Sequence, residues 1–114
     1  MFLRRTGTRG SVSRYTVHTV THILTGRKRL FDVWIRRGPY TNEITLFSQR
    51  YKFVGADLDG DAKWISTNEV VMQVYDYPDG VSSYDAEKTG ALSNHIATLT
   101  FHLDQKSGKF VERK

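Results

Sequence analysis

The sequence predicts an all-β domain, a small antiparallel sandwich or partly open barrel of about seven strands in a meander, with at most one short helix. Two observations carry this prediction. Runs rich in Val, Ile, Thr, Phe, Tyr and Trp, which favour extended structure, recur at 15–24, 30–35, 44–54, 70–77 and 96–103. Gly, Pro, Asn and Asp, the residues of tight turns, separate these runs.

The N-terminal residues 1–13 differ from the rest of the chain. They place three arginines among Gly, Ser and Thr and contain few apolar side chains. Such a composition is typical of a flexible basic arm, because little of it can be buried. We therefore expect an arm over 1–13 and a single β domain over 14–114.

The run 15–24 is dense in β-branched residues, which favours a strand over a helix. The run 30–35 alternates apolar and polar residues, as a half-buried strand does. The run 96–103 shows the same alternation. These two alternating runs predict five core residues: Phe31, Val33, Ile35, Leu99 and Phe101.

The run 44–54 begins apolar and ends basic, which indicates a long strand that leaves the core or bulges near Ser48. An aspartate-rich loop over 55–61 and a short strand around 63–66 are expected next. The longest irregular stretch spans 78–94, with one or two helical turns expected near 82–90. A hairpin loop with a left-handed Gly108 then leads to a short last strand at Phe110.

The composition is that of one globular domain. With 114 residues, of which 39% are hydrophobic and 25% charged, the chain can bury one modest core. The absence of Cys excludes disulfides, thiolate zinc sites and a Cys nucleophile. No apolar run reaches the roughly 18 residues of a membrane-spanning helix. The first residues lack the apolar centre of a secretory signal, so the localisation stays open.

The net charge of +5 is unevenly distributed along the chain. Residues 1–50 hold ten Lys and Arg against two acids, whereas residues 51–114 hold seven against ten. Such an asymmetry occurs in proteins with acidic partners, nucleic acids or anionic membrane surfaces. In a β fold the halves of a sequence often interleave, so the asymmetry need not survive as a patch.

No motif of a catalytic, cofactor or metal site is complete. The nucleophile elbow, the phosphate-binding glycine loop and the zinc-binding His-Glu-x-x-His are all absent. His18 and His22 share a strand face but lie about 13 Å apart at about 3.3 Å per residue, too far for one metal ion. We therefore expect that the protein is not an enzyme and has no cofactor.

Asp57, Asp59 and Asp61 resemble the opening of a calcium-binding loop, in which alternate carboxylates converge on the ion. The loop of an EF-hand has Gly directly after the third acid, where this chain has Ala62. We interpret the segment as a solvated turn.

Two groups of residues are candidates for binding a macromolecule. The tyrosines at and beyond the last residues of the run 70–77 have the amphipathic character of interface residues: Tyr75, Tyr77 and Tyr84. Basic residues accompanied by a tryptophan resemble a surface for single-stranded nucleic acid: Arg27, Lys28, Arg29, Trp34, Arg36 and Arg37. In a hairpin these basic residues would lie at two opposite ends.

The first hypothesis for function is binding of another macromolecule, with a protein favoured, through aromatic-rich loops. The alternative is binding of nucleic acid by the basic first half of the chain. The oligomeric state stays open.

The interpretation of the aspartate segment as a turn predicts no response to calcium. Adding millimolar calcium, or a chelator, should leave the melting temperature unchanged. A calcium site would instead stabilise the fold by about 2.7 kcal/mol at a hundredfold excess over the dissociation constant. A calcium-dependent rise that disappears in Asp59→Ala would contradict the interpretation.

Overall fold

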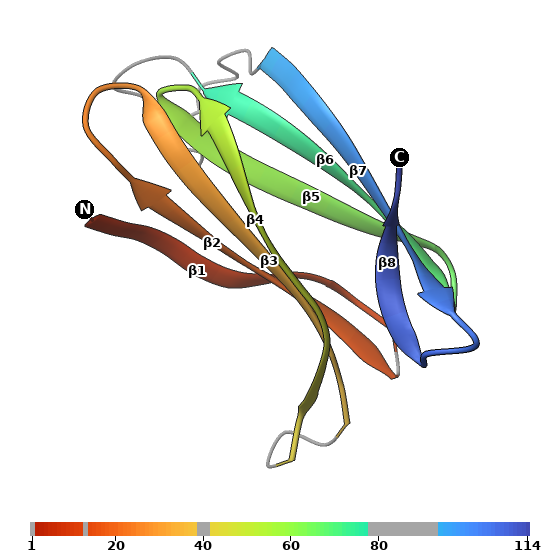
Figure 1. Cartoon of the computed structure of the whole chain (residues 1–114). Helices are drawn as coiled ribbons and strands as arrows, with labels where there is room; N and C mark the ends of the chain where they lie inside the picture. The colour runs from red at the N-terminus through yellow and green to blue at the C-terminus, as the bar shows by residue number, and fades with distance from the viewer. Residues whose placement is uncertain (1, 13, 39–41, 78–93) are drawn as a thin grey trace.

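The protein is described by a computed structural model that covers residues 2–12, 14–38, 42–77 and 94–114, without the side chains of residues 2–9 and 57. These residues form eight strands in two four-stranded antiparallel sheets (Figure 1). Sheet A consists of β1 (Phe2–Ser11), β2 (Tyr15–Ile23), β3 (Lys28–Arg37) and β4 (Ile44–Val54). Sheet B consists of β5 (Asp57–Ser66), β6 (Glu69–Tyr77), β7 (Asn94–Asp104) and β8 (Lys109–Arg113).

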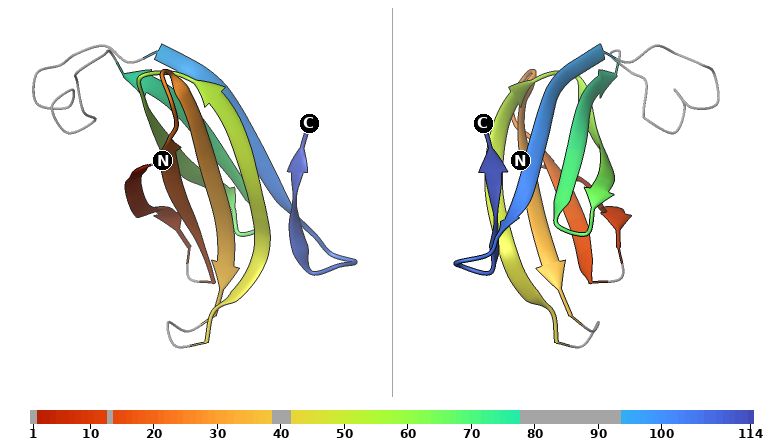
Figure 2. Two further views of the ribbon diagram at one scale, coloured as in Figure 1. Left: turned by 60° about the vertical axis from the view of Figure 1, so that its left-hand side comes forward. Right: turned by 90° about the vertical axis from the view of Figure 1, so that its right-hand side faces the viewer.

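The two sheets pack against each other as a sandwich (Figure 2). Within each sheet every strand pairs with the next one in sequence, so each sheet is a meander. The predicted all-β fold is confirmed, with eight strands in place of about seven. No helix is found in the part of the chain that the structure describes, and hence none that is suited to cross a membrane.

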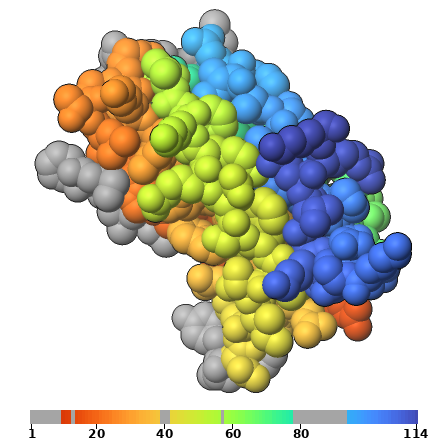
Figure 3. All heavy atoms as spheres, viewed as in Figure 1, coloured from red at the N-terminus to blue at the C-terminus, as the bar shows by residue number. Residues whose placement is uncertain are grey.

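The core lies between the sheets and is built by alternate residues of the strands. All five residues predicted for it are buried. Aromatic contacts join the two layers: the rings of Phe47 in β4 and Phe101 in β7 lie 4.7 Å apart, and those of Tyr15 in β2 and Trp64 in β5 lie 5.9 Å apart. At one edge of the sandwich β4 lies beside β8 (Figure 3), and the Tyr51 hydroxyl of β4 donates a 2.6 Å hydrogen bond to Glu112 of β8.

The structure differs from the sequence predictions in the N-terminal segment. The segment expected to be a flexible arm contains β1, which pairs with β2 in antiparallel register from Phe2↔Ile23 to Ser11↔Thr16. The composition pointed to an arm because the segment has few apolar side chains. Backbone hydrogen bonds of a sheet do not depend on apolar side chains, and the unpaired edge of β2 supplies partners for them.

A second difference concerns the aspartate segment. The interpretation of Asp57, Asp59 and Asp61 as a turn is wrong, because these residues belong to β5 and pair with β6. The register shift in β4 lies opposite Ile35 and Arg36, between Thr45 and Phe47, slightly before the predicted position near Ser48.

The predicted Gly108 turn is confirmed by its φ of 72°. The short helix expected near 82–90 and Tyr84 lie outside the described residues.

The burial of Phe101 predicts a large cost for its removal. Its side chain is fully buried and contacts the Phe47 ring, so Phe101→Ala should lower the free energy of unfolding by about 3–5 kcal/mol through lost transfer energy and a residual cavity. Chemical denaturation measures the loss. Val111→Ala on the exposed side of β8 serves as control and should cost about 0.5 kcal/mol or less. Equal losses in the two variants would contradict this core assignment.

Candidate binding surface

The structure separates the predicted basic residues into two groups at opposite ends of β3. Arg27 and Lys28 lie at the β2–β3 turn, whereas Arg36 and Arg37 lie at the far end of the strand. Eight residues of strand separate Lys28 from Arg36, or about 26 Å at about 3.3 Å per residue. The two groups therefore do not form one patch. This separation agrees with the expectation that a hairpin would place them at its two opposite ends.

Three segments meet at the end of the sandwich that contains Arg27 (Figure 1). They are the β2–β3 turn, the two-residue connection from β4 to β5, and the C-terminal end of β6. The amide of Gly55 in the connection donates a 2.8 Å hydrogen bond to the carbonyl of Arg27. The amide of Ala56 donates a 2.8 Å hydrogen bond to Oδ1 of Asp76 in β6. The connection is thus fastened to both sheets.

Arg29, one of the predicted basic surface residues, lies inside this junction and is only 7% exposed. Its Nη1 donates to the carbonyls of Gly26 and Lys28, both at 2.9 Å. Its Nε and Nη2 donate to the carbonyl of Ala56 at 3.1 and 2.6 Å. The guanidinium therefore donates to three carbonyls of the turn and the connection, of which that of Lys28 also accepts a 3.0 Å hydrogen bond from the Leu24 amide.

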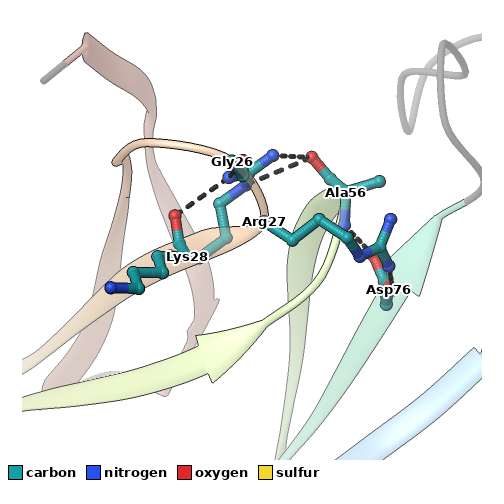
Figure 4. Close-up of polar contacts among 6 residues, drawn as sticks. Gly26, Arg27, Lys28, Ala56 and Asp76 are labelled. Carbon is teal, nitrogen blue, oxygen red and sulfur yellow. Dashed lines mark hydrogen bonds and ion pairs between the residues drawn. The ribbon is translucent and has the colours of Figure 1, made fainter.

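Asp76 is the acidic counterpart of Arg29 at the junction and is also 7% exposed. Besides the Ala56 amide, it faces the guanidinium of Arg27, with Nη2 3.4 Å from Oδ2 (Figure 4). A Cβ atom at Gly55 would lie 2.8 Å from Oδ1 of Asp76, so a larger residue there would displace the carboxylate. The absence of a side chain at position 55 lets Asp76 reach the connection.

The outer rim of the junction carries a mixed surface, which we call the corner surface and define as Arg27, Lys28, Val54 and Tyr77. Lys28 and Val54 are paired across β3 and β4, and the Val54 side chain is 72% exposed. Tyr77 pairs with Asp57, the first residue after the connection, and is half-buried. The corner surface thus combines residues from both groups of the sequence prediction.

Tyr75, the other described tyrosine of the prediction, lies two residues before Tyr77 in β6. It belongs to the strand and not to a loop, and its ring contacts His95 edge-on, with 5.6 Å between the ring centroids. It therefore faces outward from sheet B beside the corner surface.

Trp34, Arg36 and Arg37 lie away from the corner surface, toward the far end of β3. The guanidinium of Arg36 lies 5.8 Å from the centroid of the Trp34 ring and 3.4 Å from the carboxylate of Glu43. Arg37 is exposed. The stacking face of Trp34 is thus next to a cation that already has an acidic partner.

The outer face of sheet A carries a charged network that the sequence does not reveal. Asp32 is 7% exposed and accepts hydrogen bonds from Arg50 Nε at 2.7 Å and Nη2 at 2.9 Å. Nε2 of His22 lies 2.9 Å from Oδ2 of the same carboxylate. The alternation of β3 gives the face on which Asp32 lies, but its two partners come from β2 and β4 and depend on the strand register.

The same network lowers the pKa of Asp32 below its ordinary value. The hydrogen bonds from Arg50 are the main cause, burial opposes them, and the contact with His22 adds to the lowering. The carboxylate is therefore ionised at neutral pH and is held in place by its partners. Its role is structural, because it links β3 to β2 and β4 on the face of sheet A.

The histidines and aspartates considered as metal ligands do not form a cluster in the described part of the chain. The described residues include no group of three His, Cys, Asp or Glu side chains placed to hold a metal ion. The three aspartates follow one another at alternate positions of β5, where Asp59 pairs with Tyr75 and Asp61 with Gln73.

Comparison with known proteins gives no relative. Neither a protein-family model, nor a curated protein, nor a solved structure matches the chain. The function must therefore be argued from the residues and their geometry.

The burial of Arg29 predicts that the junction depends on it more than on its exposed neighbour. Arg29→Met keeps much of the apolar stem but removes four hydrogen bonds to the carbonyls of Gly26, Lys28 and Ala56, so it should cost about 2–4 kcal/mol of unfolding free energy. Arg27→Met removes a half-exposed ion pair and should cost less than about 1 kcal/mol. Urea denaturation compares the two, and a larger loss for Arg27→Met would refute the assignment.

The Asp32 network predicts a specific dependence of stability on pH. Because the folded-state pKa is lowered, ionised Asp32 stabilises the fold above its unfolded-state pKa of about 3.9, and this contribution is lost as the pH falls through the folded-state value. Asp32→Asn should therefore cost about 1–3 kcal/mol at neutral pH. Urea denaturation across pH should show the difference shrinking below about pH 4. A difference that stays constant over that range would exclude this role of the carboxylate.

Proposed function

We propose that the protein is a non-enzymatic β domain that binds another protein through the corner surface. The observation that carries this proposal is that Arg27, Lys28, Val54 and Tyr77 lie at the same end of the sandwich, where the two sheets are joined. Lys28 and Val54 lie on the outer side of sheet A, and Tyr77 lies on that of sheet B. Tyr and Arg are the side chains most enriched at the energetic centres of protein interfaces. An aliphatic side chain as exposed as Val54 adds apolar area that a partner can cover.

The junction beneath the corner surface supports the proposal. Two buried charged side chains, Arg29 and Asp76, fix the backbone on which the corner surface lies. A surface held in one conformation loses little conformational entropy when it binds. The exposed cations of the corner surface then favour a partner with acidic residues around an apolar contact.

Nucleic-acid binding is the second candidate, and one observation favours it. The strands of sheet A contain nine Lys and Arg and one acid, whereas those of sheet B contain three Lys and Arg and seven acids. The fold thus keeps the basic half of the sequence in one layer. Against this candidate, the guanidinium groups of Arg29, Arg36 and Arg50 are already occupied by carbonyl or carboxylate oxygens.

Site-specific photo-crosslinking tests the first candidate in the cells that naturally make the chain. A photoreactive phenylalanine analogue in place of Val54 should give a discrete adduct with another protein. The same analogue in place of Ile65, which is 62% exposed at the far end of β5, is the matched control and should not give that adduct. Lys28→Glu should weaken the Val54 adduct. Identical adducts from both positions, or none from Val54, would contradict the proposal.

A salt titration with a fluorescent single-stranded oligonucleotide tests the second candidate. If the protein works through the corner surface, its affinity for the oligonucleotide should stay within the non-specific range of about 10⁻⁴–10⁻⁶ M. A tighter complex would favour nucleic acid instead. In that case the slope of log affinity against log salt concentration should become shallower by about 1 in Lys52→Glu, because one phosphate contact is lost.

A further inference from the structure

We propose that β8 opens and closes as a unit while the rest of the domain stays folded, and that the hydrogen bond between Tyr51 and Glu112 holds it closed. This inference concerns the edge of the sandwich where β4 and β8 lie side by side (Figure 3). The two strands are the last strands of different sheets and are not neighbours in either hydrogen-bond ladder. The corner surface is not involved.

β8 is the shortest strand in the part of the chain that the structure describes. It has five residues, whereas the other strands have nine to eleven. Its ladder partner is β7 alone, from Thr100↔Arg113 to Asp104↔Lys109. Of its five side chains only that of Phe110 is buried. Segments with a short ladder and few buried apolar contacts are those that open locally in folded proteins.

Phe110 provides the apolar contact that holds β8. Its side chain is 3% exposed, and its ring lies edge-on to those of Tyr15 and Trp64, with 5.0 and 5.9 Å between the ring centroids. Tyr15 is paired with Arg37, so this contact lies at the opposite end of the sandwich from the corner surface. Withdrawal of Phe110 removes one cover from the rings of Tyr15 and Trp64.

Two polar contacts hold the C-terminal end of β8. Oε1 of Glu112 accepts the 2.6 Å hydrogen bond from the hydroxyl of Tyr51, and both side chains are half-buried. Burial and the neighbouring carboxylate raise the pKa of Tyr51, so the hydroxyl stays protonated and donates at neutral pH. Nη1 of Arg113 lies 3.1 Å from Oε2 of Glu69, but the Arg113 side chain is 58% exposed, and such pairs contribute little. The bond to Tyr51 is therefore the main polar contact, and it links β8 to sheet A.

Opening of β8 costs less free energy than unfolding of the domain. It breaks one five-residue ladder and removes one ring from the core, and it regains the conformational entropy of five residues. In the open state β7 becomes the edge of sheet B, and the rings of Tyr15 and Trp64 become accessible. The position of β8 thus controls access to the end of the core opposite the corner surface.

Native-state hydrogen exchange, followed by NMR, tests the inference. The opening constant of the β8 amides that are bonded to β7 should be at least about 100-fold larger than that of the Val33 amide in β3. Low concentrations of urea should hardly change the β8 value, because local opening exposes little surface, whereas the Val33 value should rise steeply. Equal opening constants in the two strands would overturn the proposal.

Two substitutions separate local opening from global unfolding. Tyr51→Phe removes the hydroxyl that donates to Glu112 and should raise the opening constant of β8 about tenfold. Val20→Ala is the control, because Val20 is buried on the outer side of sheet A in β2, with β3 between it and β4. It should raise the opening constant of Val33 about tenfold by destabilising the whole domain and leave that of β8 unchanged.

Circular dichroism checks that both variants remain folded. A rise of the β8 opening constant in Val20→Ala equal to that of Val33 would show that β8 opens only when the domain unfolds. An unchanged β8 opening constant in Tyr51→Phe would show that the hydrogen bond to Glu112 does not hold the strand. Either result would contradict the proposal.

Discussion

The structure depends on how the chain passes from one sheet to the other. A sandwich built from two successive meanders has one such passage, and here it is two residues long, Gly55 and Ala56. At this point the backbone leaves the hydrogen-bond ladders of both sheets, so its amides and carbonyls need other partners. A buried polar group without a partner costs about 1–3 kcal/mol. Arg29 supplies donors to the carbonyl of Ala56, and Asp76 accepts its amide. The two buried ionic side chains thereby fasten the turn of one sheet to the last residues of β6 in the other.

This connection also explains how the charges of the molecule are arranged. Because each sheet is a meander, the first half of the chain forms one layer and the second half the other, so the uneven charge of the sequence becomes a difference between the two sheets. The corner surface lies where the layers are joined, over the junction. One topological feature thus separates the charges of the chain and places the protein-binding surface that we propose.

The fold was predictable because its signals are local. The alternation of Phe31, Val33 and Ile35 gives both the strand and its buried face. The sites were less predictable because they depend on pairs distant in sequence. Nothing near Arg29 indicates that the carbonyl of Ala56 will lie against it, and the partners of Asp32 come from two other strands. For the same reason the sequence predicts irregular structure for β1 and for the first half of β5. These segments are strands because they pair with β2 and β6, more than because of their own residue types.

Amide hydrogen exchange of Gly55 and Ala56, followed by NMR, tests the central claim most directly. If the junction holds the sheets together, both amides are donors in buried hydrogen bonds and open only when the whole domain unfolds. Their protection should then match that of core amides such as those of Val33 and Phe101, although they lie in a two-residue connection between strands. Exchange near the rate of an unstructured peptide, in a domain whose core amides remain protected, would show that the connection is an ordinary loop and would contradict the account.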